Sequence, residues 1–149
     1  MEIILTIDKN AVYEEVAQTT SYTGAKMSDS LAYDRIFTTD EDRSMLERFW
    51  NESKNTICNS LKKVLVAESE TTEGTYTLTL GLSTAYDVSL TESMRRSLFS
   101  FFVMNITAKW YNFTNKGEAE GCATEAATYI DDIMRKAFFK KRPMRPTYS

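Results

Sequence analysis

The residues that could do chemistry in this chain are few, and their types exclude most forms of catalysis. The 149 residues contain no histidine, so no imidazole can act as a general base, ligate a metal or complete a catalytic triad. The two cysteines, Cys58 and Cys122, lie far apart and show no zinc-binding spacing. The five glycines are scattered singly, which excludes the glycine-rich loops that bind phosphate.

Carboxylates cluster at two places, and neither arrangement favours catalysis. Asp131 and Asp132 are adjacent in a predicted helix, where neighbouring side chains point about 100° apart. The acidic run at 40–42 lies at the predicted start of a helix, where the helix dipole favours negative charge. Both clusters are typical of solvated side chains. We therefore predict that the protein is not an enzyme and has no catalytic, cofactor or metal site.

Basic residues are concentrated at the C-terminus of an otherwise acidic chain. The net charge is −3, from 18 Lys and Arg against 21 Asp and Glu. Six basic residues lie in the last fifteen positions and no acid follows Asp132, so residues 1–134 carry 12 positive and 21 negative charges, a net of −9. A dedicated DNA-binding protein usually has a basic face instead. The distribution suits head-to-tail contact between copies, or contact with an acidic neighbour. The six are Arg135, Lys136, Lys140, Lys141, Arg142 and Arg145.

Three interpretations of this C-terminal tail stay open. The tail can be a solubilising end after a helix C-terminus that favours cations. It can instead order against a partner through aromatic anchors, with proline limiting the entropy of the free tail. It can also contact phosphate groups. The aromatic anchors of the second interpretation are Phe138, Phe139 and Tyr148. The phosphate contacts of the third would come from Lys140, Lys141, Arg142 and Arg145.

The stretch 98–113 is apolar on more sides than one helix of a monomer normally buries. Eleven of its sixteen residues are apolar, and Lys109 is its only charge. A surface helix usually has a single apolar stripe about 100° wide. At about 24 Å the stretch is too short to cross a bilayer, which needs roughly 20 mostly apolar residues. We therefore expect part of this helix, around Phe101, Met104 and Tyr111, to contact another subunit.

Three long helices are predicted from the three- and four-residue spacing of apolar positions. The first covers residues 40–66. The second covers 89–115 and opens on a capping box formed by Ser89 and Glu92. The third covers 118–140, and the small residues of its apolar stripe would let it pack closely against the second helix.

Alternating apolar residues predict a small β element with strands near 2–7 and 75–83. The second strand must pair with the first, with the loop at 68–74, or with another subunit. An open strand edge is a docking surface, so the last alternative bears on assembly. A short helix at 11–18 and a mostly loop segment at 19–34 complete the N-terminal part.

These elements predict one mainly α domain over residues 1–149, a compact bundle of three long helices with a small β element and an extended C-terminal tail. Residues 1–38 are expected to form an N-terminal strand and loop extension, 39–140 a helical core with a strand insertion, and 141–149 the extended basic tail. The N-terminus lacks the basic and apolar regions of a signal peptide. We therefore expect a cytosolic protein with reduced cysteines.

The order of these features resembles the head–tail connector proteins of tailed bacteriophages, also described as adaptor, head-completion or neck-ring proteins. The residues that carry the resemblance are Ala108-Lys109-Trp110-Tyr111-Asn112, near the end of the aromatic helix, and the segment 133–145, which ends in basic and proline residues. The resemblance covers residues 89–146 and, more loosely, the helix at 40–66.

The resemblance implies a structural virion protein without catalysis. It implies a cyclic homo-oligomer, commonly twelvefold, that joins the portal protein to the next neck or tail ring. Such a ring lines a channel for double-stranded DNA, is located in the virion neck, is assembled in the bacterial cytoplasm and contacts no membrane. An acidic body suits this role, because a lumen that repels phosphate does not trap moving DNA. Two alternatives remain: another neck or tail-completion ring protein, and a cellular helical binding module whose basic tail contacts nucleic acid.

Overall fold

The computed structural model describes residues 1–26 and 42–140 and is mainly helical with a small antiparallel sheet. In chain order the elements are β1 (Glu2–Asp8), α1 (Lys9–Lys26), α3 (Arg43–Ser60), β2 (Leu65–Glu70), β3 (Thr75–Gly81), the 3-10 helix η2 (Val88–Leu90), α4 (Thr91–Thr114) and α5 (Lys116–Phe138). The predicted class, mainly α with a small β element, is confirmed. The count of three long helices is corrected to four within the described residues.

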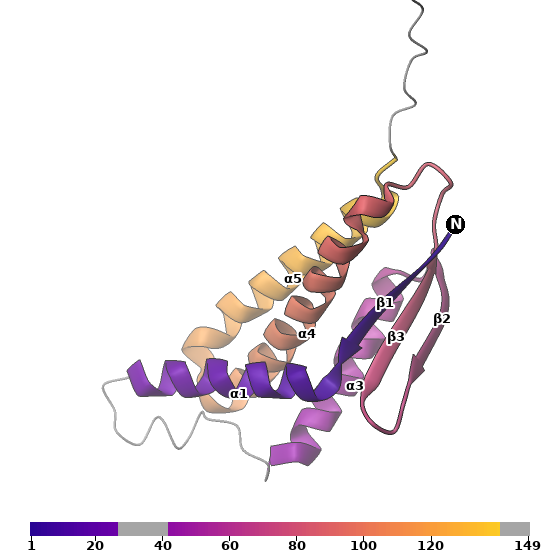
Figure 1. Ribbon diagram of the computed structural model, residues 1–149. Helices are drawn as coiled ribbons and strands as arrows, with labels where there is room; N and C mark the ends of the chain where they lie inside the picture. The colour runs from indigo at the N-terminus through magenta and orange to yellow at the C-terminus, as the bar shows by residue number, and fades with distance from the viewer. Residues whose placement is uncertain (27–41, 141–149) are drawn as a thin grey trace, which may run out of the picture.

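The sheet has the strand order β1-β3-β2, and all its strands are antiparallel (Figure 1). The two predicted strands pair with each other, and their inward residues match in register. The matched pairs are Ile3 with Leu80, Leu5 with Leu78, and Ile7 with Tyr76, all buried. The opposite face of β1 is exposed, with Ile4 at 62%. The alternation therefore defines one core face and one open face, as a half-buried sheet requires.

The third strand, β2, replaces the last turns of the helix that was predicted over 40–66. Helix α3 ends at Ser60, a turn covers 61–64, and the chain then pairs with β3. Leu61, Val64 and Leu65 fit the spacing of a helix, which is why the prediction ran too far. The Val64 and Leu65 N–H groups still donate to the Leu61 carbonyl in the turn, but the Val64 carbonyl accepts from the Gly81 N–H at 2.7 Å, and from there the chain pairs with β3.

Helix α1 is longer than the predicted helix at 11–18 and continues to Lys26, through residues expected to be loop. Thr20 is fully buried, and its hydroxyl donates to the carbonyl oxygens of Val16 and Ala17. A threonine whose hydroxyl bonds to its own helix is tolerated in the interior. With Val12 and Val16 also buried, β1 and α1 belong to the core, and the expectation that they form an extension outside it is corrected.

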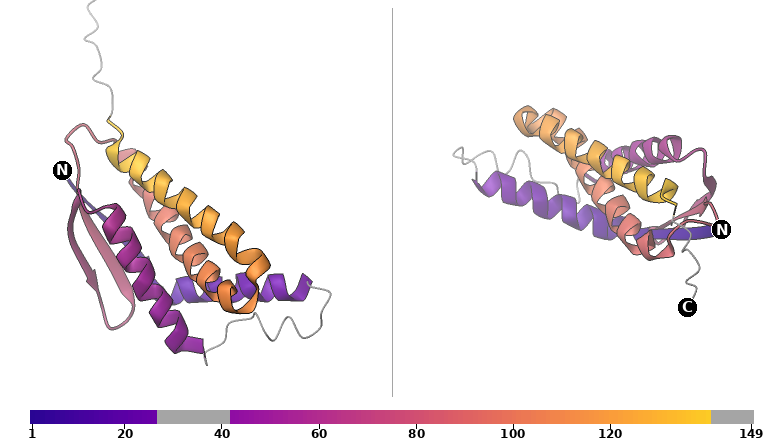
Figure 2. Two further views of the ribbon diagram at one scale, coloured as in Figure 1. Left: turned by 180° about the vertical axis from the view of Figure 1, so that it is seen from behind. Right: turned by 90° about the horizontal axis from the view of Figure 1, so that it is seen from above.

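Helix α4 runs through the centre of the molecule and is covered by other elements of the same chain. Helix α1 crosses it on one side, α5 runs antiparallel to it on another, and α3 and β1 complete the cover (Figures 1 and 2). The ring of Phe102 lies 4.5 Å from Trp50 and 5.7 Å from Tyr76, measured between centroids. The apolar sides of α4 that were expected to need a second subunit are thus largely buried within one.

The ends of α4 differ from the predicted capping. The Asp87 carboxylate accepts a hydrogen bond from the Ser89 N–H at 3.0 Å and so caps the short helix η2. Helix α4 then begins at Thr91, and Glu92 pairs with Arg95 inside its first turns instead of closing a capping box with Ser89. The local Asx turn replaces the capping box because the Asp87 carboxylate accepts both the Ser89 N–H and, at 2.7 Å, the Ser89 hydroxyl, the two groups of Ser89 that the box would use.

Helices α4 and α5 form a close antiparallel hairpin. The buried positions Ala119, Ala126 and Ile133 recur every seven residues along α5, and Ala137 follows one turn later. Small side chains on such a seam allow the two helix axes to approach closely. This confirms the predicted pairing of the alanine-rich helix with the aromatic one.

Adjacent alanines of α5 provide a test of this hairpin. Ala126 is 2% exposed against α4, whereas Ala127 is exposed. We expect Ala126→Leu to destabilise the protein by about 1–3 kcal/mol through overpacking, and the matched control Ala127→Leu to stay within about 0.5 kcal/mol of wild type. Urea unfolding of the three proteins measures both effects. Equal effects of the two substitutions would contradict close packing at Ala126.

Candidate assembly surface and polar networks

The residues predicted to contact another subunit or a partner differ in their exposure in the structure. Phe101 and Tyr111 are buried within the subunit, so the expectation that they meet a neighbour is wrong, because the chain itself covers every side of α4 at these positions. Met104 is partly exposed. The exposed ones are Phe138, Phe139 and Lys140. The predicted residues outside the described part of the chain are Lys141, Arg142, Arg145 and Tyr148.

The C-terminal end of α5 presents two adjacent aromatic side chains to solvent. Phe138 is 47% exposed and Phe139 is 51% exposed. A hollow of about 310 Å³ lies beside Phe138, and its other lining residues are Ser60, Lys62, Lys63 and Met134. Lys140 forms a backbone bridge with Tyr86, which holds the chain directly after α5. We call the exposed residues of this region the aromatic end: Phe138, Phe139, Lys62, Lys63 and Lys140.

A groove follows α4 between α1 and α5. Its deeper part has a volume of about 210 Å³, with Glu15 of α1 and Tyr129 of α5 as walls. The floor comes from α4 and consists of Phe99, Ser100, Val103 and Met104. A second hollow of about 480 Å³ continues the groove toward the start of α4 and is lined by Arg95, Arg96, Phe99 and Ser100. We call these two neighbouring hollows, which share Phe99 and Ser100, the α4 groove.

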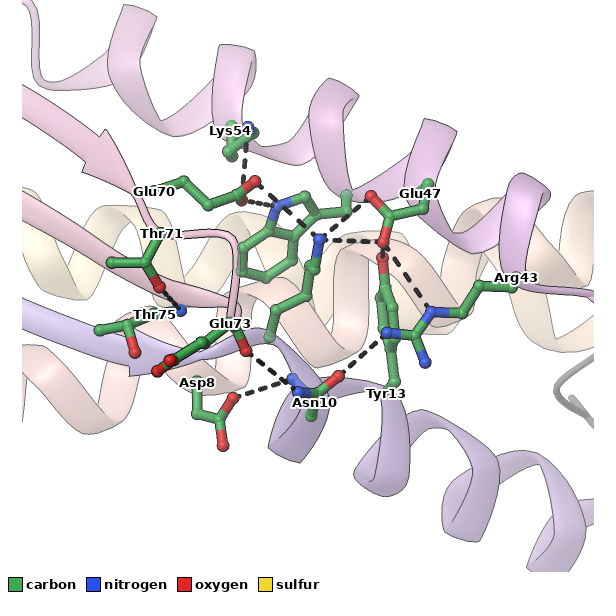
Figure 3. A network of polar contacts seen from close by, with 12 residues as sticks. Asp8, Asn10, Tyr13, Arg43, Glu47, Lys54, Glu70, Thr71, Glu73 and Thr75 are labelled. Atoms are coloured by element: carbon green, nitrogen blue, oxygen red, sulfur yellow. Dashed lines mark hydrogen bonds and ion pairs between the residues drawn. The ribbon is translucent and has the colours of Figure 1, made fainter.

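A polar network joins the start of α1 to α3 and to the β2–β3 hairpin (Figure 3). Its centre is Glu47, which accepts hydrogen bonds from the Tyr13 hydroxyl at 2.8 Å and the Lys9 ammonium at 3.2 Å. Arg43 lies over the Tyr13 ring at 4.7 Å from its centroid. The network therefore fixes how α1 leaves the sheet and crosses α3.

Glu70 extends the network to the edge strand β2. Its carboxylate accepts a hydrogen bond from the Trp50 indole N–H and lies 3.5 Å from the Lys54 ammonium. The Lys9 ammonium is 3.9 Å away. A buried indole N–H needs such an acceptor, so Glu70 ties the largest core side chain to the hairpin.

The contacts in this network shift two pKa values in the directions that keep Glu47 charged and Tyr13 neutral at neutral pH. Burial alone would raise the pKa of Glu47, but hydrogen bonds from Lys9 and Tyr13 and the charge of Arg43 outweigh it and hold that pKa below its ordinary value. Burial and the hydrogen bond to Glu47 raise the pKa of Tyr13. The phenol thus stays a donor and the carboxylate an acceptor, as a structural network requires, and no proton is poised to move.

A second polar cluster links Cys58, Glu68 and Tyr76 between α3 and the hairpin. The Cys58 thiol and the Tyr76 hydroxyl both donate to Glu68 Oε2, at 3.0 and 2.5 Å. Burial and the hydrogen bond to Glu68 raise the pKa of Cys58 to about 11. The thiol is therefore held protonated and unreactive, which is typical of a structural cysteine.

Three further contacts orient α4 against its neighbours. Asn105 donates to the Ser53 hydroxyl at 2.7 Å, and Lys109, the only charge of the aromatic stretch, lies 3.0 Å from Glu52. Toward α5, Asp132 accepts hydrogen bonds from Ser97 and Lys136. The carboxylate of Asp132 thus has a packing role, while its neighbour Asp131 is exposed to solvent.

Sequence reasoning could not locate these networks, because the residues that meet across different elements are 8 to 61 positions apart and share no motif. Within residues 1–26 and 42–140, no group of three metal-ligating side chains is arranged to hold a metal ion. No helix in that same part of the chain is both long and apolar enough to cross a membrane.

Comparison with known proteins adds no relative to this picture. No protein-family model matches the chain, and no similar curated protein or solved structure is found.

Replacing Glu47 with glutamine tests the first network. We expect a loss of about 1–2 kcal/mol in the free energy of unfolding at pH 7, the range for a charged hydrogen bond at a partly exposed site. The pKa of Glu47 is lower when folded than its ordinary 4.5, so this contribution is present above about pH 4.5 and is lost as the pH falls through the folded pKa. Urea unfolding at pH 7, 5 and 3 should show wild type and variant converging at low pH. Glu14→Gln, on the exposed side of α1, is the matched control, and a gap that persists unchanged at pH 3 would contradict the assignment.

Alkylation of Cys58 tests the second cluster. In a Cys122→Ser background, we expect the folded protein to react with iodoacetamide at pH 8 about 100-fold more slowly than the urea-unfolded protein, because a pKa raised from 9 to about 11 lowers the thiolate fraction by that factor. Glu68→Gln should speed the folded reaction, since it removes the carboxylate that raises the pKa. Equal rates for the folded and unfolded protein would refute a half-buried thiol that is held protonated.

Proposed function

We propose that this protein is a structural subunit of a tailed-bacteriophage virion, a head–tail connector that forms a ring between the portal protein and the tail. The proposal combines the resemblance of residues 89–146 to connector proteins with one structural observation, the aromatic end of α5. Its location would be the virion neck, after assembly in the cytoplasm of the bacterial host.

The aromatic end carries the argument for assembly. Single exposed apolar residues are ordinary, but Phe138 and Phe139 are adjacent, about half exposed, and flanked by three exposed lysines. Aromatic side chains are the residues most enriched at the centres of protein interfaces. The combination of apolar and cationic groups favours a partner surface that supplies apolar contact and negative charge.

The central helix contributes rigidity to this proposed role. Because most of α4 is covered by its own chain, contacts between subunits must use what stays accessible: the aromatic end, the edges of the sheet, and the partly exposed α4 residues Phe99, Ser100 and Met104. The net charge of −9 over residues 1–134 suits a channel wall along which DNA slides without binding. The proposed partners are further copies of the chain, the portal protein and the next neck or tail ring, and the proposed role needs no catalysis and no cofactor.

Assembly of the purified protein tests this function. We expect light scattering to give a mass of many subunits and negative-stain electron microscopy to show closed rings, because identical head-to-tail contacts form a ring when their rotations add up to a full turn. The protein should also co-sediment with a portal protein encoded near its gene. A strict monomer at high concentration that ignores the portal protein would overturn the proposal. Rings that bind a tail protein but no portal would assign it to a tail-completion ring instead.

A second candidate function follows from Lys62 and Lys63, which line the hollow beside Phe138. Cations beside an aromatic ring are typical of sites that contact nucleic acid through phosphate and base stacking. A cellular binding module of this kind would shift DNA or RNA in gels with a steep salt dependence. Deleting residues 140–149, or the double substitution K62A/K63A, should then reduce the slope. Weak binding that does not depend on these residues would exclude this candidate.

A further inference from the structure

We propose that the aromatic end of one copy docks in the α4 groove of a second copy, so that copies join head to tail. The inference rests on the proposed ring function and specifies the two surfaces that would form its repeating contact.

The α4 groove has the shape and chemistry to receive aromatic side chains. Phe99, Val103 and Met104 give it an apolar floor, and α1 and α5 stand on either side. The hollow above this apolar floor has a volume of about 210 Å³ and opens into the second hollow at Phe99 and Ser100, which line both. Methionine adapts its shape and makes favourable sulfur contacts with aromatic rings, so Met104 suits a docked phenylalanine.

The charges of the two surfaces are complementary. The walls of the deeper hollow bring carboxylates near its mouth: Glu15 lines it directly, and Glu125 accepts a hydrogen bond from the lining Tyr129 at 3.2 Å. The aromatic end carries exposed lysines beside its two phenylalanines. At the other end of the groove, Arg95 and Arg96 both pair with Glu92, at 2.7 and 3.6 Å, which reduces their repulsion of a basic partner. We therefore place the lysines of the incoming copy toward Glu15 and Glu125.

The occupant of the groove must come from another copy. Phe138 lies nine positions after Tyr129 on the same helix, about 14 Å along its axis, so it cannot fold back into a groove walled by Tyr129. The two surfaces also belong to different parts of the subunit. Each contact therefore leaves one aromatic end and one groove free, which is the heterologous arrangement that propagates into a ring.

Complementary variants test this contact. F138S/F139S removes the aromatic end and leaves the groove intact, whereas Met104→Lys places a charge on the groove floor and leaves the aromatic end intact. We expect each variant alone to be monomeric. An equimolar mixture should form a one-to-one heterodimer and nothing larger, because only one functional contact remains between the two. Light scattering after size exclusion measures these masses.

The controls separate this inference from the proposed function. Thr6→Lys, on the exposed face of β1, should assemble like wild type. Circular dichroism melts check that each variant is folded, and Ser100→Arg is the second groove variant in case Met104→Lys unfolds. If wild type assembles and the folded end and groove variants assemble equally well, the inference is overturned while the ring function stands. If wild type is monomeric at all concentrations, the ring function fails and this contact with it.

A disulfide test locates the contact directly. A copy with Phe139→Cys and a copy with Met104→Cys, both in a Cys58→Ser/Cys122→Ser background, should form a mixed disulfide under mild oxidation. The pair of Phe139→Cys with Thr6→Cys should not, because Thr6 lies on the open face of the sheet. A mixed disulfide of equal yield in both pairs would indicate random collision and would refute the proposed docking.

Discussion

The rest of this structure depends on one constraint: α4 is apolar around most of its circumference, so most of its surface must be covered by other elements. A helix with a single stripe needs one partner, whereas α4 has buried residues facing α1, α3, α5 and β1. Each element that covers α4 then needs only one apolar face. Helix α5 fully buries only four residues, three alanines and Ile133, and the sheet buries one face and leaves the other open. The arrangement in Figure 2, with elements grouped around a central helix, follows from this division.

Polar contacts between neighbouring elements fix how α3 and α5 are oriented against α4. Ser53 with Asn105, Glu52 with Lys109, and Asp132 with Ser97 all lie where a covering helix meets α4. Each such contact contributes on the order of 1 kcal/mol or less, so apolar burial supplies most of the stability. Their effect is specificity, because an apolar surface alone permits a helix to slide or rotate. The network around Glu47 and Glu70 does the same for α1 and the hairpin.

The alternating apolar residues of β1 and β3 made these strands predictable, as did the periodic residues of α4 and α5. Strand β2 was not predictable, because every residue after Leu65 is exposed and the two positions that bond to core side chains, Glu68 and Glu70, are carboxylates, so no apolar alternation marks the strand. The length of helix α1 was underestimated because its second half is polar in sequence, and the hydrogen bonds by which the buried Thr20 hydroxyl is satisfied within the helix cannot be read from the sequence. Of the candidate site, Phe138, Phe139 and Lys140 could be recognised from sequence because they are adjacent, whereas Lys62 and Lys63 join the aromatic end only in the fold. The α4 groove could not, because it exists only where α1 and α5 stand on opposite sides of α4.

Covering the central helix within one chain changes where assembly must occur. A subunit that needed a neighbour to bury Phe101 and Tyr111 would be unstable alone, and folding and assembly would be inseparable. Here the subunit core is complete, so contacts between copies can be formed by rigid surfaces that lose little conformational entropy on binding. Both surfaces of the proposed contact include residues on the stiff α4–α5 hairpin. A fixed angle between aromatic end and groove would give every contact the same rotation, and a constant rotation is what closes a chain of identical subunits into a ring of defined size.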